Sequence, residues 1–344
     1  MMRSRVYLDW NATAPLRAEA RAAMVAAMDV VGNPSSVHAE GRGARALVEK
    51  ARARVAAAVG CKPAEVVFTS GATEAAAVLG RLPVASVEVD PTAHDCLWSQ
   101  RRAGEGSRAI GWGYANNETG LITEPPAREA GVPLMLDIVQ AVGKVPFSFA
   151  WSGAEMAVVS AHKFGGPKGI GALIVRDGVE VPAILTGGGQ EMGRRAGTEN
   201  VIGIAGMGAA AEAAQRDLEA GVWDEVAEFR NILDGALSSA TNNTISVGKG
   251  ASRLPNTLCL IAPGWKGETQ VMAMDLAGFA ISAGSACSSG KVKASRVLKA
   301  MGYDEAQASQ AIRISLGPGV TKEEVLRFAD AWCAQYRKAL SRAA

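Results

Sequence analysis

Short apolar runs alternate with longer amphipathic stretches along the first two thirds of the chain. Runs of aliphatic and β-branched residues, bounded by turn-forming residues, predict buried strands at 66–69, 85–89, 108–114, 133–136, 156–159 and 171–176. Alanine-rich amphipathic stretches predict helices at 15–28, 43–59, from about 75, 201–220 and 222–240. Because strands that alternate with helices form largely parallel, doubly wound sheets, the pattern favours an α/β fold.

The hydrophobic pattern is interrupted at 246–253, where the chain becomes rich in glycine and polar residues, as is typical of a domain boundary. Beyond it the pattern predicts a smaller α/β unit with two strands and a closing helix, at 256–261, 311–317 and 321–339. We therefore expect two domains. The large one covers residues 13–250, and the small one is built from residues 1–12 and 251–344.

A glycine-rich loop at 160–169 follows the strand at 156–159, so Lys163 comes just past the end of a buried strand. Open α/β sheets bind ligands at the carboxyl ends of their strands. A lysine that loses its solvent there has a lowered pKa, which frees its amine for Schiff-base chemistry. For a single lysine, a surface turn is the plainer interpretation. Ser160, His162 and two glycines that let a ligand approach the backbone favour a functional site.

A small polar turn, Ser70-Gly71-Ala72-Thr73-Glu74, follows the strand at 66–69 and leads into an alanine-rich helix. Free N–H groups and the helix dipole at such a turn can hold a phosphate. The alternative is a simple N-cap by Ser70 or Thr73, and the turn alone does not decide between them.

Polar side chains gather at the predicted ends of several strands. They are Thr73, His94, Asn117, Asp137, Gln140, Ser160, His162 and Lys163. An acid, an amide, an imidazole and a lysine beside a phosphate site suit a pyridoxal phosphate enzyme. In such an enzyme an aspartate pairs with the pyridine nitrogen and a lysine forms the Schiff base.

Two further candidates lie in the predicted small domain. Cys287 sits in a loop of small residues at 282–290, which favours an exposed and reactive thiol over a packed one. Arg313 lies in a short apolar strand. An arginine at a sheet edge is the common case, but the planar guanidinium also suits a substrate carboxylate.

Composition narrows the function classes. The chain has 344 residues, 48% of them hydrophobic, and a net charge of +2 with acids and bases interspersed, so no nucleic-acid partner is expected. No signal-peptide core or apolar run of about twenty residues appears, so we expect no membrane span. The five cysteines are scattered without a CxxC, which indicates reduced thiols in the cytoplasm and no metal site or disulfide framework.

Taken in order, the motifs of this chain resemble those of the cysteine desulfurases of the NifS/IscS type. These enzymes belong to the class V aminotransferase group of fold-type I pyridoxal phosphate enzymes. The similarity covers nearly the whole chain, and its motifs are 32–36, 69–74, 116–120, Asp137 with Gln140, 162–163, 197–198, 285–287 and 312–317. It implies a mostly parallel sheet with a smaller α/β domain, pyridoxal 5′-phosphate as cofactor, and a homodimer.

The resemblance also implies roles for the matching residues. Lys163 would hold the cofactor as a Schiff base and move protons, and Asp137 would bind the pyridine nitrogen. His94 would stack on the ring and assist proton transfer. Gln140 would bind the ring hydroxyl oxygen, and Asn117 would be a further cofactor contact. The phosphate would be bound by Ala72, Thr73, Ser160 and His162. Thr198 would reach the phosphate of the other subunit.

The implied substrate is L-cysteine. Arg313 would bind its carboxylate, Asn117 would contact substrate or cofactor, and Cys287 as a thiolate would attack its sulfur. The products would be L-alanine and an enzyme persulfide. The loop that bears Cys287 matches the subgroup that hands sulfur to iron–sulfur scaffold proteins.

The chain departs from the family's pattern between His94 and Asn117, where about two dozen residues replace roughly twice that number. The missing piece corresponds to a strand and a helix at the sheet edge, and its loss could alter the activity. Three other pyridoxal phosphate activities therefore stay open, namely selenocysteine lyase, β-eliminase and aminotransferase. So does a shortened paralogue that binds or regulates a full-length desulfurase, although retention of the candidate residues argues against it.

Overall fold

The computed structural model describes residues 5–240, 243–284 and 294–343. The chain divides into two compact units. Unit 1 comprises residues 1–13, 115–122 and 221–344, and unit 2 comprises residues 14–114 and 123–220. Cys287 lies outside the described residues.

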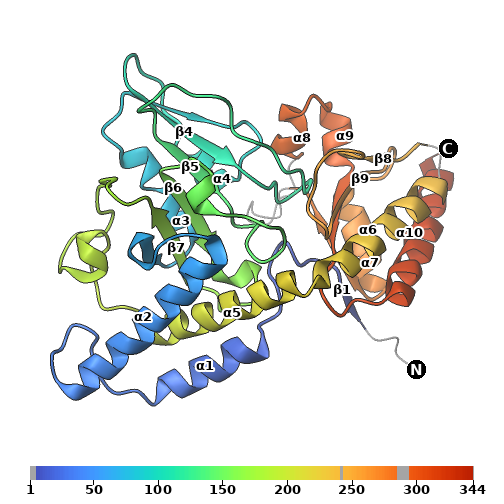
Figure 1. Ribbon diagram of the computed structural model, residues 1–344. Coiled ribbons are helices and arrows are strands. Elements are labelled where there is room, and N and C mark those ends of the chain that lie inside the picture. The colour runs from blue at the N-terminus through green and yellow to red at the C-terminus, as the bar shows by residue number, and fades with distance from the viewer. Residues whose placement is uncertain (1–4, 241–242, 285–293, 344) are drawn as a thin grey trace. The chain divides into compact units, whose positions relative to one another are not determined.

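A six-stranded sheet forms the centre of unit 2 (Figure 1). Its spatial order is β2 (Val66–Thr69), β7 (Gly171–Val175), β6 (Met156–Ser160), β5 (Leu134–Asp137), β4 (Arg108–Gly113) and β3 (Ser86–Val89). Strands β3 to β6 are parallel, and β7 is antiparallel to both of its neighbours. β2 therefore runs in the same direction as β3 to β6, and β7 alone is reversed.

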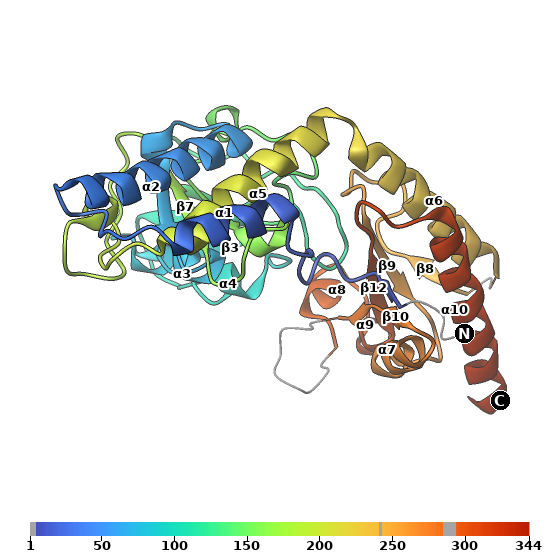
Figure 2. The ribbon, with the colours of Figure 1, turned by 90° about the horizontal axis from the view of Figure 1, so that it is seen from below.

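Helices cover both faces of this sheet (Figure 2). One face carries α1 (Ala18–Met28), α2 (Ala39–Val59) and α5 (Val201–Glu219), and the other carries α3 (Ala72–Ala76) and α4 (Asp95–Trp98). α2 and α5 pack closely because Gly208 faces Ala51, where an added Cβ would lie 2.6 Å from the Ala51 side chain. The middle strands are wholly buried, which explains their unbroken apolar sequence.

The helix predicted to begin at about residue 75 begins three residues earlier, at Ala72, and is short. α3 ends at Ala76, a short 3₁₀ turn follows at Leu79–Arg81, and β3 already begins at Ser86. Gly80 and Pro83 disfavour a continued helix, and the chain has too few residues here for both a long helix and a return to the sheet. Leu79 instead packs against β4, directly over Gly111.

Unit 1 is built on a four-stranded antiparallel sheet. Its spatial order is β11 (Ser282–Ala283), β12 (Ala311–Ser315), β9 (Thr257–Ile261) and β8 (Ile245–Ser246). A second small sheet pairs β1 (Val6–Tyr7) in parallel with β10 (Phe279–Ala280). The helices of the unit are α6 (Val222–Ala240), α7 (Gly267–Leu276), α8 (Arg296–Ala300), α9 (Glu305–Ser309) and α10 (Lys322–Ala343).

An aromatic cluster holds two of these helices together. Trp265 stacks on Tyr336 of α10 with ring centroids 5.9 Å apart, and Trp332 lies beside both rings. Trp332 donates its indole N–H to Gln270 of α7 at 3.0 Å, so this buried polar group is satisfied.

α6 belongs to unit 1, whereas the sequence pattern placed the domain boundary after residue 250. Arg230 on α6 donates to the carbonyl of Leu254 at 2.6 Å, and Asp234 on the same helix pairs with Arg253 at 2.8 Å. These contacts join α6 to the end of the stretch at 246–253 that we interpreted as a domain boundary, and to Leu254 directly after it. Among the described residues, no helix is both long and apolar enough to cross a membrane.

The segment after β7 is anchored in unit 2 by a buried ion pair. Glu191 forms two 2.8 Å hydrogen bonds with Arg52 of α2 and accepts the backbone N–H of Phe68 at 2.7 Å. Burial disfavours the Arg52 cation, but the hydrogen bonds and charge of Glu191 outweigh it and raise the pKa of Arg52. Glu191 and Met192 both have positive φ angles, 48° and 58°, which is strained for residues with side chains. The ion pair therefore holds a backbone conformation that local preferences oppose.

We expect Arg52→Met to destabilise the protein by about 3–5 kcal/mol, because it leaves the Glu191 carboxylate buried and unpaired. Arg54→Met is the matched control on the same helix. Its partner Glu212 is 43% exposed, so the loss should stay below about 1 kcal/mol. Urea unfolding followed by circular dichroism measures both variants. Equal losses would show that the buried pair has no special importance.

Candidate active site

The direction of the strands in unit 2 brings several turns to one edge of the sheet. β2, β3, β5 and β6 run the same way, so their carboxyl ends lie along a common edge. Four candidate segments occupy this edge: Ser70 after β2, His94 after β3, Asp137 at the end of β5, and Ser160 at the end of β6. The sheet thus gathers the predicted cofactor residues that follow its strands.

Asp137 is a buried residue, only 7% exposed. Its Oδ1 accepts the backbone N–H of Val139 at 3.0 Å. Burial raises the pKa of Asp137, whereas the nearby charges of His94 and Lys163 act to lower it. A buried carboxylate of this kind is stabilised by a cationic donor, and a protonated ring nitrogen would be one.

His94 lies close to Asp137. A ring nitrogen of His94, a carboxylate oxygen of Asp137 and the sulfur of Cys96 lie within 4.8 Å of one another. His94 caps α4, and its Nδ1 accepts the backbone N–H of Cys96 at 3.2 Å. The neutral ring therefore carries its proton on Nε2. Burial raises the pKa of the Cys96 thiol, so this cysteine stays protonated near neutral pH.

Lys163 ends a 3₁₀ turn, Ala161–Lys163, that continues β6 without a break. The loop is held from the other side by Arg17, whose Nε donates to the carbonyl of Phe164 at 2.9 Å. His162 is half-buried in the same turn. Burial and the charges of Lys163, Lys168 and Lys144 lower the pKa of His162 to about 4. This concentration of positive charge suits an anionic group such as a phosphate.

Lys144 is a site residue that sequence reasoning missed. It is 3% exposed, and its Nζ donates to Oε1 of Gln140 at 2.6 Å. Gln140 is itself 3% exposed, so its amide, which we predict to contact a ring hydroxyl oxygen, is held in a fixed orientation. The available signal was a lysine four positions after Gln140 in an apolar stretch, since lysine is seldom buried unless it has a partner.

The predicted phosphate turn has an open backbone. Gly71 caps α3, and a Cβ added there would meet nothing within 4 Å. Glu74 accepts the backbone N–H of Ser70 at 2.8 Å and pairs with Arg195 at 3.0 Å. Burial opposes the ionisation of Glu74, but hydrogen bonds from Arg195 and Ser70 outweigh it and lower the Glu74 pKa. Ala72 and Thr73 form the first turn of α3, and their contact with a phosphate stays a prediction.

Thr198 lies in the segment that Arg195 connects to this turn. It is exposed, and it lines a cavity of about 260 Å³ together with Thr69, Ser70 and Asn200. The structure thus places Thr198 at the side of the phosphate turn in its own subunit, and its predicted contact with the other subunit stays a prediction.

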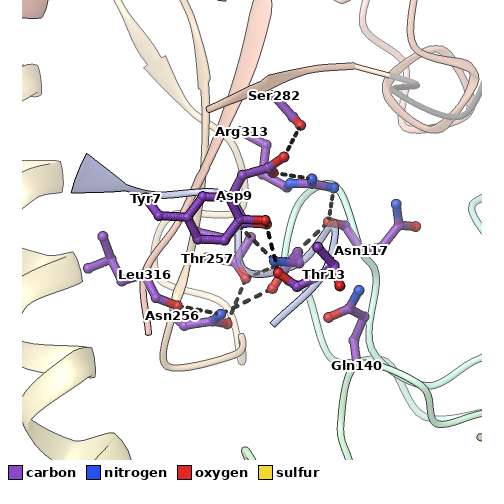
Figure 3. A network of polar contacts seen from close by, with 12 residues as sticks. Tyr7, Asp9, Thr13, Asn117, Gln140, Asn256, Thr257, Ser282, Arg313 and Leu316 are labelled. Atoms are coloured by element: carbon purple, nitrogen blue, oxygen red, sulfur yellow. Dashed lines mark hydrogen bonds and ion pairs between the residues drawn. The ribbon is translucent and has the colours of Figure 1, made fainter. Parts of the chain in front are cut away.

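Two predicted substrate residues lie in unit 1 and are connected to each other (Figure 3). Nη1 of Arg313 donates to the backbone carbonyl of Asn117 at 3.0 Å, and Nη2 pairs with Asp9 at 2.7 Å. Arg313 is 4% exposed and lies on β12 between β11 and β9. The interpretation of Arg313 as an arginine at a sheet edge, which we considered the common case, is therefore wrong. Sequence reasoning missed Asp9, although it directly follows the short apolar run at 6–8.

The donor set of unit 2 fits pyridoxal 5′-phosphate. A buried carboxylate suits the ring nitrogen, and Gln140 offers a buried amide. Lys163 offers an amine, and the basic cluster and the open turn at Gly71 suit the phosphate. Cys287 contributes nothing to this test because it lies outside the described residues.

Comparison with known proteins tests the family to which the chain belongs. The family model of class-V aminotransferases matches residues 6–84 and 105–328. The unmatched residues between these two stretches, 85–104, contain β3, His94 and α4. Cysteine desulfurase IscS of Dictyoglomus turgidum is 34% identical, with 94% of this chain and 92% of the relative covered. Cysteine desulfurase 2 of Trichormus variabilis is 37% identical, with 94% and 90% covered.

Solved structures agree with the sequence comparisons. A NifS-like protein from Rickettsia africae has a TM-score of 0.87 at 26% identity, covering 97% of this chain and 99% of the other. These matches confirm the resemblance to the NifS/IscS type and the fold-type I class. The chain belongs to the class-V aminotransferase family.

Proposed function

We propose that this protein is a pyridoxal phosphate-dependent cysteine desulfurase. Named cysteine desulfurases that are 34–37% identical over most of the chain support this function. The observation that carries it is the convergence of Asp137, His94 and Lys163 at one edge of the sheet in unit 2. His94 lies there although it falls in the stretch that the family model leaves unmatched.

The reaction needs no external oxidant. The C–S bond of L-cysteine breaks, an S–S bond forms at the Cys287 sulfur, and a proton is added to the substrate's Cβ. The products are L-alanine and a persulfide on Cys287, so atoms and electrons balance. Bound pyridoxal phosphate supplies a conjugated ring that withdraws electrons from the α-carbon of an amino acid.

Residues of unit 2 would hold the cofactor and move protons. The amine of Lys163 would attach the cofactor covalently and carry a proton between the substrate's Cα and Cβ. Asp137 would keep the ring nitrogen protonated, and His94 would contact the ring face and exchange protons through Nε2. The phosphate would lie against Ala72, Thr73, Ser160 and His162.

Residues of unit 1 would bind the substrate. Arg313 would bind the carboxylate of L-cysteine in the bidentate manner that its planar guanidinium allows, and Asn117 would contact substrate or cofactor. Cys287, as a thiolate, would attack the substrate sulfur. An aminotransferase or β-eliminase would not need this thiol, so its presence favours desulfuration.

We further propose a cytoplasmic homodimer that passes sulfur to an acceptor such as an iron–sulfur scaffold protein. Exposed apolar side chains on the connection from α1 to α2 support an interface in unit 2. Val31 is 79% exposed and Val37 is 88% exposed. Four cysteines described in the structure are free thiols, which suits a reducing compartment.

Lys163→Ala should abolish covalent attachment of the cofactor. Borohydride reduction of the wild-type protein with pyridoxal phosphate should label the peptide that contains Lys163. Lys168→Ala, which removes a lysine from the same loop, should be labelled like the wild type. Mass spectrometry of the digests checks this, and a label that persists in the Lys163→Ala protein would rule out the assignment.

Cys287→Ser should lower the rate of alanine formation from L-cysteine by about a hundredfold or more, because no nucleophile remains to take the sulfur. In the wild type, mass spectrometry after incubation with L-cysteine should find one added sulfur on the peptide with Cys287. Cys61→Ser, at a half-buried cysteine of unit 2, is the control and should remain active. Undiminished alanine formation in Cys287→Ser would favour another activity.

Light scattering at micromolar concentration should give about twice the monomer mass of 35.5 kDa. Val37→Asp should shift the protein toward the monomer, since it places a charge on the proposed interface. Trp151→Asp is the control, because Trp151 is equally exposed at 90% but lies on a different turn. A monomeric wild type with full cofactor occupancy would refute the dimer.

A further inference from the structure

Asp9 accepts hydrogen bonds from two side chains of the four-stranded sheet in unit 1. Its Oδ1 accepts from Nη2 of Arg313 at 2.7 Å, and its Oδ2 accepts from the hydroxyl of Ser282 at 2.8 Å (Figure 3). The side chain of Arg313 is 4% exposed and that of Asp9 is 17% exposed. The two oxygens of one carboxylate thus connect two strands, β12 and β11.

Backbone pairing fixes where these three side chains lie. Ser282 on β11 is directly opposite Arg313 on β12, so both side chains leave the sheet on the same face. Asp9 follows β1 and forms a parallel bridge with Ser315, further along β12. Asp9 is therefore held in register with the strand that carries Arg313.

Arg313 has a second fixed contact, and one of its three side-chain nitrogens has no partner. Its Nη1 donates to the carbonyl of Asn117 at 3.0 Å, and this carbonyl also accepts from the Asn11 side chain at 3.2 Å. Its Nε is buried without a hydrogen-bond partner among the described residues. A buried guanidinium N–H without an acceptor is unfavourable, and a carboxylate would satisfy it.

We propose that Asp9 is a positioning residue for the substrate carboxylate. It holds the guanidinium of Arg313 from one side, so that the unpaired Nε edge is oriented for the ligand before the ligand arrives. This inference rests on the proposed function, in which Arg313 binds the carboxylate of the amino acid. Asp9 itself contacts neither substrate nor cofactor in this proposal.

The charge of Asp9 is needed as well as its position. An arginine as buried as Arg313 is costly without a counter-ion, and the residue would turn toward any other acceptor that it could reach. With Asp9 ionised and tied to Ser282, the guanidinium has one preferred orientation. A ligand carboxylate then adds to a geometry that already exists, which favours tight binding because little side-chain freedom is lost.

The test compares two ligands that differ only at the carboxylate. L-Alanine and L-alaninamide are titrated into the holoprotein, and the change in cofactor absorbance and the heat of binding give both dissociation constants. The lower amine pKa of the amide affects every variant equally, so the preference for L-alanine over the amide isolates the carboxylate contact. The wild type should prefer L-alanine by about tenfold to a hundredfold.

Asp9→Asn keeps the shape but removes the charge, and Asp9→Glu keeps the charge but displaces it. Both should lower the preference for L-alanine by about tenfold, while binding of the amide changes little. Asp275→Asn is the matched control, because Asp275 pairs with Arg5 in the same unit but is 56% exposed. It should keep the wild-type preference.

The variant Arg313→Gln tests the proposed role of Arg313 separately from the proposed role of Asp9. If Arg313→Gln loses the preference while Asp9→Asn and Asp9→Glu keep it, Asp9 does not position the guanidinium and the inference is overturned. If Arg313→Gln itself keeps the preference, the proposed role of Arg313 is wrong. If Asp9→Asn does not fold, Asp9→Glu still decides, since it retains the counter-ion that folding requires.

Discussion

Strand β7 runs against both of its neighbours, and the position of the chemistry in unit 2 depends on this reversal. β2 and β6 are separated by β7 and so point the same way, which brings the turn at Ser70 to the edge that holds Ser160 and Asp137. At the start of β7, the backbone must pass close to the backbone of the turn that follows β2. A Cβ on Gly171 would lie 2.7 Å from the Cα of Gly71, so only glycine lets β7 begin beneath that turn.

Much of this arrangement was predictable from the sequence, because an apolar run followed by polar residues marks the end of a strand. Asp137 and Lys163 each follow an unbroken apolar run, and their strands form where the run predicts them. Arg313 shows the limit of that reasoning. Its strand was predicted, but whether β12 lies at the edge or the centre of its sheet depends on pairing with β9 and β11, which no local pattern encodes. Asp9 was missed for the same reason, since its partner Arg313 lies 304 residues further along the chain. Lys144 was missed although its partner Gln140 lies only four residues away, because a buried lysine is rare.

The short length of α3 has a different cause. Its alanine-rich sequence has high helix propensity, yet the helix stops at Ala76. The short connection between α3 and β3 outweighs the helix propensity of the sequence, because β3 must begin at Ser86 to pair with β4. The family model does not match residues 85–104, and this stretch overlaps the shortened connection between His94 and Asn117. His94 still lies beside Asp137, so the sheet edge positions this side chain without the longer family connection.

The pair of Asp9 and Arg313 joins positions 304 residues apart. The first residues of the chain belong to unit 1, and the whole of unit 2 is synthesised before residues 221–344, which make up most of unit 1. During translation β1 has no partner until β10 emerges, and Asp9 has no counter-ion until β12 follows. Unit 2 can fold before synthesis is complete, whereas β1 stays unpaired until the last part of the chain is made. The arginine that we assign to substrate binding is therefore set in place only when synthesis is almost complete.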